Sequence, residues 1–260
     1  METNPTPWIN ALRHSHHTLR TAVEPLGADQ LQRRSYASDW SIAQVLSHLG
    51  SQAEIFSMFL DAGLSGQDPP DRDAFPAIWE AWNSRSPQDQ VTDALHADNA
   101  VTERFESLDA GQRQRLRLKL FGMDLDATGL ARMRLGEHAI HTWDVAVALD
   151  PAATVAPDAV DLLVDTLGQL AVRTAKPGGN QRRLHVLTSS PERHFTLDVA
   201  ETVTLTASEG DGGDEGLPEL RLPAEALVRL VYGRLDPAHT PPVETRQVDL
   251  DELRQLFPGF

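Results

Sequence analysis

The sequence predicts an α+β protein of two domains, a four-helix bundle in residues 1–152 and a smaller α+β domain with a mainly antiparallel sheet in residues 153–260. In the first part, apolar residues recur every three or four positions over long segments, which is typical of amphipathic helices. In the second part, short segments alternate apolar and polar residues, which is typical of half-buried strands. The stretch DPAATVAPDA, with two prolines and several small residues, marks the boundary between them.

The first domain is predicted to hold four long helices, and such helices with these connections favour a bundle. Ser41, followed three residues later by Gln44, has the signature of a capping box and is expected to open the second helix. The Gly-, Pro- and Asp-rich segment GLSGQDPPDRDAFP is expected to be a loop. The four helices are predicted at about residues 8–23, 41–62, 87–108 and 128–149.

The second domain is predicted to mix helices and strands. The acidic, glycine-rich segment SEGDGGDEG is expected to be a hairpin or a surface loop, and KPGGN a turn. Helices are expected at about residues 158–174, 223–232 and 250–256, and strands at LHVLTS, FTLDV and TVTLTA.

The amino-acid composition limits the kinds of partner that the protein can bind. The chain has 260 residues, with 23 basic and 38 acidic side chains and a formal net charge of −15. So negative a surface repels phosphate backbones and anionic lipid, which argues against nucleic acid and membrane partners. A small anionic substrate would need a local cationic group to bind.

The chain contains no cysteine, which excludes disulfides and a nucleophilic thiol of its own. The N-terminal residues lack a basic segment followed by an apolar one, so we expect no secretory signal. The sequence has no apolar run near the roughly 20 residues of a membrane helix. We therefore expect a cytoplasmic protein.

The strongest chemical signal is the pair Glu137 and His141 in GEHAIHTWDVAVALD. Residues four apart project from one face of a helix, and the rest of this segment is apolar enough to be buried. Buried ionisable groups need partners. A shared metal ion would satisfy this pair, and so would a salt bridge within the helix.

His48, on the second predicted helix, is the candidate for a third ligand. A set of two histidines and one glutamate suits zinc, and three protein ligands leave an open position, as in catalytic sites. Taken alone, a histidine at that place is more typical of a core or rim residue.

Other ionisable residues nearby are given different roles. We expect His14, His16 and His17 on a solvated face of the first helix, and we exclude His138 because it points about 100° away from Glu137. Asp144 could orient the ring of His141 by accepting its free N–H. It could equally pair with Arg134, and the sequence leaves both alternatives open.

The segments W-S-I-A-Q-V-L-S-H-L at 40–49 and E-H-A-I-H-T-W-D at 137–144 resemble the mycothiol-dependent maleylpyruvate isomerase family. Members of this family join a DinB-like four-helix metal-binding domain to a smaller α+β domain, and the resemblance covers nearly the whole chain. It implies that His48, Glu137 and His141 are the metal ligands. It also places a family-like Gly-Arg pair at Gly233 and Arg234.

The resemblance further implies Zn²⁺ or another divalent metal, and mycothiol or a related thiol as cosubstrate. A thiolate would add to the double bond of a cis-enedioate, the new single bond would rotate, and loss of the thiol would give the trans product. Arg234 would bind the substrate or the thiol, since arginine pairs with carboxylates in bidentate fashion. The alternative for Arg234 is an interaction with the end of its helix. Arg229 and Arg221 are weaker candidates.

We therefore expect a metal-dependent isomerase or S-transferase, monomeric or homodimeric, that acts on a small electrophile. One alternative is a zinc-dependent hydrolase that activates water at the same site, with Asp144 as a general base. The other is a small-molecule-binding protein without catalytic activity.

Overall fold

The computed structural model describes residues 4–37, 39–179, 181–208 and 216–259, and the chain divides into two compact units, Met1–Ala159 and Val160–Phe260. The composition change seen in the sequence lies in the link of residues 150–156, between helices α7 and α8. Within the described residues, none of the helices combines the length and apolar character needed to cross a membrane.

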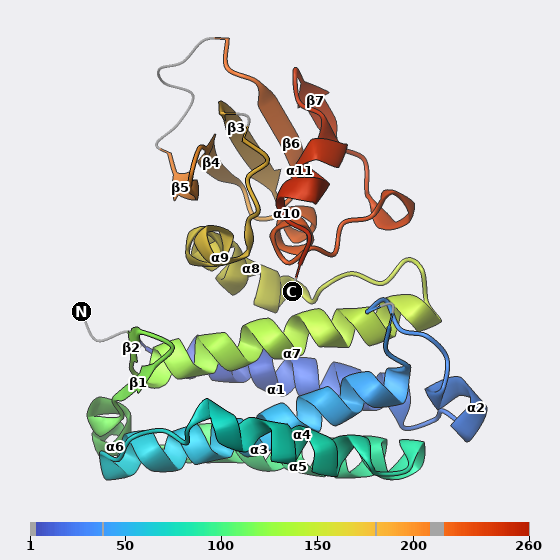
Figure 1. Ribbon diagram of the computed structural model, residues 1–260, viewed down its shortest axis with the longest axis vertical. Helices are drawn as coiled ribbons and strands as arrows, with labels where there is room; N and C mark the ends of the chain where they lie inside the picture. The colour runs from blue at the N-terminus through green and yellow to red at the C-terminus, as the bar shows by residue number, and fades with distance from the viewer. Residues whose placement is uncertain (1–3, 38, 180, 209–215, 260) are drawn as a thin grey trace. The chain divides into compact units, whose positions relative to one another are not determined.

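The first unit is a four-helix bundle, as predicted. Its long helices α1, α3, α5 and α7 run side by side (Figure 1), with α1 against α5 and α7, and α3 against the same two. The elements are α1 Thr6–Val23, α2 Ala28–Leu31, α3 Ile42–Ser65, η1 Arg72–Ala74, α4 Phe75–Asn83, α5 Pro87–Glu106, α6 Ala110–Arg115, β1 Leu118–Leu120, β2 Met123–Leu125 and α7 Ala127–Leu149.

Side-chain caps fix where the two site-bearing helices begin. The predicted capping box of α3 is present: Ser41 Oγ accepts from the Gln44 amide at 3.2 Å, and Gln44 Oε1 accepts from the Ser41 amide at 2.8 Å. Asp126 caps α7 by accepting from the Gly129 amide at 2.8 Å. These caps set which residues of α3 and α7 face the bundle interior.

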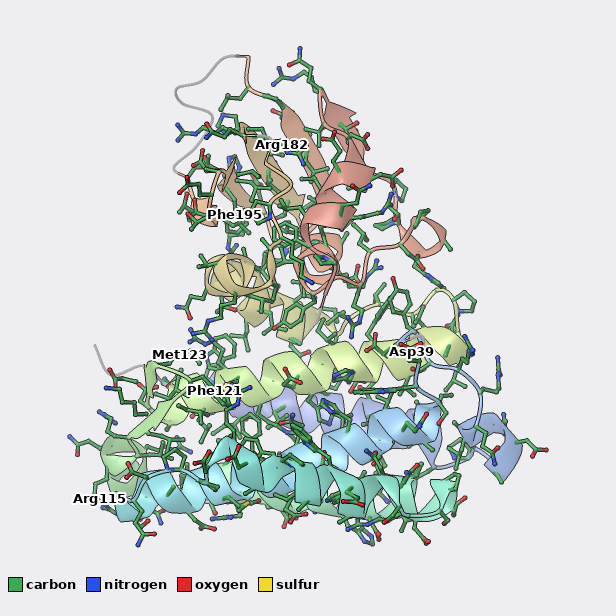
Figure 2. The ribbon with its side chains drawn as sticks, viewed as in Figure 1. Asp39, Arg115, Phe121, Met123, Arg182 and Phe195 are labelled. Atoms are coloured by element: carbon green, nitrogen blue, oxygen red, sulfur yellow. The ribbon has the colours of Figure 1, made fainter. Side chains whose placement is uncertain are left out.

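Apolar side chains from all four helices fill the inside of the bundle (Figure 2). The short helix α4 packs closely on α3, because the buried ring of Trp82 lies over the backbone of Gly50. A Cβ at position 50 would stand only 2.1 Å from that ring.

Two parts of this unit differ from the prediction. The segment 63–76 is not wholly a loop, because α3 continues to Ser65 and then η1 and the first turn of α4 follow. The antiparallel hairpin of β1 and β2 was not predicted either. Its strands are only three residues long, too short for an alternating pattern to stand out.

The second unit contains a five-stranded sheet in the order β5-β4-β3-β6-β7, antiparallel except for the β3–β6 pair. Helix α9 packs on β5, and α10 packs on β3 and β6. The elements after α7 are α8 Pro157–Leu163, η2 Val164–Thr166, α9 Leu167–Thr174, β3 Arg182–Ser189, β4 Arg193–Val199, β5 Val203–Ala207, β6 Glu219–Pro223, α10 Ala224–Val231, η3 Pro237–His239, β7 Glu244–Arg246 and α11 Leu250–Leu256.

The predicted strands correspond to β3, β4 and β5, and the last two predicted helices to α10 and α11. The single helix predicted at 158–174 is wrong, because η2 separates α8 from α9. Strands β6 and β7 were missed. The loop predicted at 208–216 lies almost entirely outside the described residues, as does Asn180 of the predicted turn.

Candidate metal centre

The structure brings His48 of α3 together with Glu137 and His141 of α7, at a partly buried place in the bundle. Glu137 Oε2 lies 3.5 Å from His48 Nε2 and 3.9 Å from His141 Nε2. The rings of the two histidines meet edge to face, with centroids 4.7 Å apart. One donor atom from each residue lies within 4.8 Å of the other two.

These spacings fit a common ion. Two donors bound to one tetrahedral zinc at the usual bond lengths stand about 3.4 Å apart. The observed distances therefore need only small side-chain movements to reach coordination. The side chain of Glu137 is also 35% exposed, so the group can be reached from solvent.

His48 supplies an observation that points to a ligand. Its Nε2 is buried and, among the described residues, has no hydrogen-bond partner. A buried nitrogen without a partner is unfavourable unless something outside the chain binds it. Burial also lowers the pKa of His48, which favours the neutral imidazole that a metal requires.

Glu137 is held in its ionised form. Burial alone would raise the pKa of this carboxyl, but the neighbouring His48 and His141 outweigh it and hold the pKa below its usual range. An ionised carboxylate between two imidazole nitrogens is a donor set suited to a divalent cation.

Asp144 orients His141. The Nδ1–H of His141 donates to Asp144 Oδ2 at 2.9 Å, which leaves Nε2 directed to Glu137. The other alternative, an Asp144–Arg134 pair, is not the one adopted, because Arg134 pairs with Asp98 at 2.7 Å. A carboxylate behind a histidine ligand is the usual arrangement that fixes ring orientation.

Trp40 adds an apolar wall beside the two histidines. Its ring lies 5.1 Å from the ring of His48 and 6.1 Å from that of His141, measured between centroids. Trp40 comes just before the cap of α3, so the capping box also fixes this wall.

A second buried group, not predicted, lies in the same bundle: His16 of α1, Asp98 of α5 and His138 of α7. Asp98 Oδ2 accepts from His16 Nδ1 at 2.6 Å and from His138 Nε2 at 2.8 Å. Burial alone would raise the pKa of Asp98, but His138 and Arg134 beside it hold that pKa well below its usual range.

The expectation that the three histidines of α1 are solvated is wrong for His16. His14 and His17 are exposed, whereas only 4% of His16 is exposed. The reason is helical spacing, since His16 continues the buried stripe that Leu12 and Leu19 define. This spacing is visible in the sequence, so the burial of His16 could have been predicted from it. The exclusion of His138 from the Glu137 group agrees with its contact to Asp98.

In this second group, the negative charge of Asp98 is already balanced by a protein side chain. Asp98 also accepts from Arg134 Nη2, and both side chains are almost completely buried. Adding a divalent cation beside a buried guanidinium would leave excess positive charge in the core, which is unfavourable. We interpret it as an ion network that ties three helices together.

The predicted arginines lie in the second unit. Arg234 follows Gly233, which lies two residues beyond α10 and has φ +70°, and Arg234 Nη1 donates to the carbonyl of Tyr232 at 3.1 Å. Arg229 is buried and bound through two nitrogens to Glu225, so its role is structural. Arg221 pairs with Glu219 at 2.7 Å.

A sequence model of the mycothiol maleylpyruvate isomerase N-terminal domain matches residues 12–146. A search of curated protein sequences gave no match.

Similar folds occur among solved structures. The crystal structure of the mycothiol-dependent maleylpyruvate isomerase matches with a TM-score of 0.67 and 14% identity, over 92% of this chain and 95% of that chain. A histidine-to-alanine mutant of that enzyme matches with a TM-score of 0.66 and 13% identity, over 89% and 90%. At these identities the likeness shows a shared fold.

Proposed function

This chain belongs to the family of the mycothiol maleylpyruvate isomerase N-terminal domain, and from that premise we propose that it is a metal-dependent enzyme using a small thiol. The thiol is mycothiol or a similar low-molecular-weight thiol, and the reaction is isomerisation or S-conjugation of a small electrophile. The observation that carries the proposal is the buried, unpartnered Nε2 of His48 facing Glu137 and His141.

In this proposal His48, Glu137 and His141 hold Zn²⁺ or another divalent metal. When bound, such an ion favours the thiolate form of a thiol at its open position. The chain has no cysteine, so the thiol must come from a cosubstrate. The three side chains would supply the ligands.

Asp144 acts as a positioning residue. By accepting a hydrogen bond from the Nδ1–H of His141, Asp144 keeps the lone pair of Nε2 available to the ion. The carboxylate of Asp144 is fully buried and lies on the far side of the imidazole ring. That position disfavours the hydrolase alternative, which needs a general base beside the metal.

Arg234 is proposed to bind a carboxylate of the substrate or of the thiol. With a net charge of −15, the protein needs a cationic group wherever an anion binds. A planar guanidinium can hold a carboxylate through two hydrogen bonds.

The direct test is elemental analysis of the purified protein and of the variants His48→Ala and Glu137→Gln. We expect about one metal ion per chain in the wild type and a large loss in both variants. His14→Ala is the matched control, because this exposed histidine pairs with Asp158 outside the centre. Equal, substoichiometric metal in all four proteins would overturn the proposal.

Activity separates the thiol enzyme from a hydrolase. We expect consumption of a small electrophile only when thiol is added, and loss of that activity with a chelator. Turnover that proceeds without thiol would favour water as the nucleophile.

A further inference from the structure

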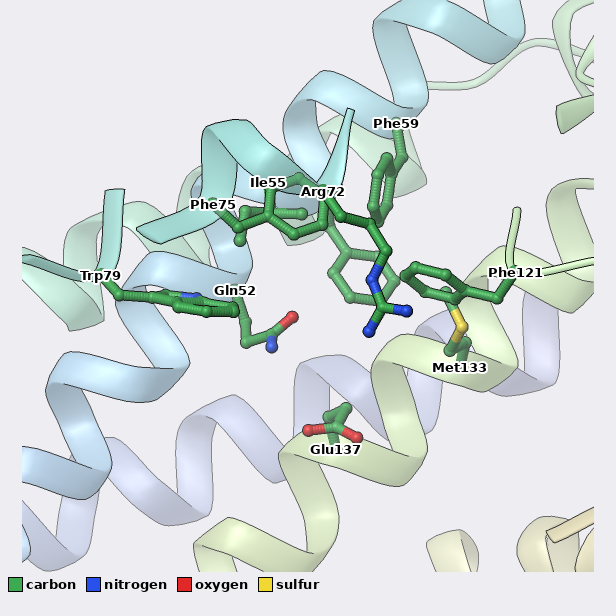
Figure 3. A pocket seen from close by; sticks show the side chains of 10 residues that line it. Gln52, Ile55, Phe59, Arg72, Phe75, Trp79, Phe121, Met133 and Glu137 are labelled. Atoms are coloured by element: carbon green, nitrogen blue, oxygen red, sulfur yellow. The ribbon is translucent and has the colours of Figure 1, made fainter. Parts of the chain in front are cut away.

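A pocket of about 180 Å³ lies in the first unit, between α3, η1, α4, the β1–β2 turn and α7 (Figure 3). Its walls are mainly apolar and include the aromatic side chains of Phe59, Phe75, Trp79 and Phe121. Glu137 also lines it, so the pocket adjoins the metal centre.

Two of these aromatic side chains are open to solvent. Trp79 is 40% exposed and Phe121 is 48% exposed, and they are two of the three large apolar side chains exposed in the described part of the chain. Exposed apolar groups gathered around a cavity are typical of a binding site. Neither residue is needed there to fill the bundle core.

Arg72 supplies the polar feature of the pocket. Its guanidinium lies 5.0 Å from the ring centroid of Phe121, and Figure 3 shows it pointing into the pocket, as does the amide of Gln52. Among the described residues, the ion pairs of the structure do not include Arg72. Glu137 is the acidic side chain that lines this pocket, and it faces His48 and His141 of the metal centre. Arg72 is therefore suited to an anion from outside.

The size of the pocket limits the occupant. A cavity of about 150 Å³ in another protein holds benzene, so this one fits a single ring with a small substituent. Small dianions are a poor match, because most of the walls are apolar and would desolvate a second charge without pairing it.

We propose that this pocket binds the electrophilic substrate as a molecule with one flat, ring-sized apolar group and one carboxylate, which pairs with Arg72. The assignment to the electrophile rests on the proposed function. Binding of such an acid does not depend on turnover and can be measured separately.

The probe is benzoate, titrated calorimetrically into the full-length wild-type protein and the variants Arg72→Gln, Trp79→Ala and Arg20→Gln. Arg20→Gln is the control, since it removes the same charge from an exposed arginine that pairs with Glu24 on α1. Benzamide serves as the neutral ligand of the same shape, and succinate as an acid without a ring.

We expect saturable 1:1 binding of benzoate, at least tenfold weaker in Arg72→Gln and in Trp79→Ala, and within twofold of wild type in Arg20→Gln. Benzamide and succinate should both bind wild type at least tenfold more weakly than benzoate. Equal benzoate affinity in Arg72→Gln and wild type, or a preference for succinate, would overturn the inference.

Repeating the titration after chelation distinguishes this inference from the proposed function. If benzoate binding depends on Arg72 but the protein has no metal and no thiol-dependent turnover, the pocket assignment stands and the proposed enzymatic function is refuted. Metal content and thiol-dependent turnover without Arg72-dependent benzoate binding would support the proposed enzyme and refute the pocket assignment.

Discussion

At the scale of single residues, position around a helix decides what each histidine does. His138 and His141 are three apart on α7, yet His138 donates to Asp98 while His141 faces Glu137. Their surroundings, rather than residue type, make one part of a buried ion network and the other a candidate ligand. The same principle separates His16 from its neighbours on α1.

The first prediction concerns Asp144. Replacing it by Asn should weaken metal affinity by roughly 10- to 100-fold, because His141 loses the carboxylate that fixes its ring. Competition with a chromogenic chelator measures the change. Asp68→Asn removes the same charge from an exposed loop and should leave the affinity unaltered. An Asp144→Asn protein that binds metal like the wild type would show that the carboxylate does not orient the ligand.

Which site residues the sequence could predict depends on local spacing. Glu137 and His141 were predicted because residues four apart on one helix share a face, and His48 because it lies at the edge of the apolar stripe of α3. Their spatial convergence needed the structure, because helix packing brings α3 beside α7. Arg72 was not predicted, since an arginine in a Pro- and Asp-rich segment resembles an ordinary loop residue.

At the scale of elements, the Asp98 network joins α1, α5 and α7 through one carboxylate. Replacing Asp98 by Asn should lower the free energy of unfolding by about 3–5 kcal/mol, because the buried charge of Arg134 loses its partner. Urea unfolding measures the loss. Asp93→Asn on the same helix is the control: its ion pair with Arg85 is partly exposed and should contribute at most about 1 kcal/mol. Similar losses in both variants would contradict the network.

The pH dependence of this contribution has a definite sign. The pKa of Asp98 is lowered in the folded protein, so between the two pKa values the unfolded chain binds more protons. The stabilisation is therefore fully present above the pKa of an unfolded aspartate, about 3.9, and is lost as the pH falls through the lower folded value. The difference between wild type and Asp98→Asn should persist at pH 5 and shrink only in stronger acid.

The packing of α4 on α3 gives another prediction. Gly50→Ala should destabilise the protein by about 1–3 kcal/mol, because the new Cβ would stand 2.1 Å from the buried ring of Trp82. Helix propensity alone would favour alanine by about 1 kcal/mol, so the sign of the change tests the contact. Thermal unfolding should show little change for Gly178→Ala, where a Cβ meets nothing within 4 Å. A stabilised Gly50→Ala protein would refute the packing argument.

The same helix shows why some elements escape prediction from sequence. The long helices have caps and repeated apolar stripes, such as Ser41 with the stripe of α3, and these signals are local. Helix α4 is nine residues long and begins with Phe75 and Pro76, so a proline-based interpretation of its start as loop was wrong. Strand β7 pairs only three residues with β6, and all three are exposed, which leaves no apolar alternation to detect.

At the scale of the whole molecule, the net charge limits which substrates can approach the protein. The net charge of −15 opposes the approach of anions, so cationic groups such as Arg72 and Arg234 must act locally. Screening by salt weakens the long-range repulsion. The three proposed ligands all belong to Met1–Ala159, whereas Arg234 belongs to Val160–Phe260.

Metal removal should therefore affect the two units unequally. A ligand that binds only the folded state stabilises it by about 2.7 kcal/mol at a hundredfold excess over its Kd. All three proposed donors come from α3 and α7, so amides in these helices should lose protection from hydrogen exchange after chelation, and amides in β3 and β4 should change less. Mass spectrometry of peptides from the intact protein measures both regions at once. His48→Ala should show no response to the chelator, and an equal response of the sheet and the bundle would argue against an ion held by α3 and α7.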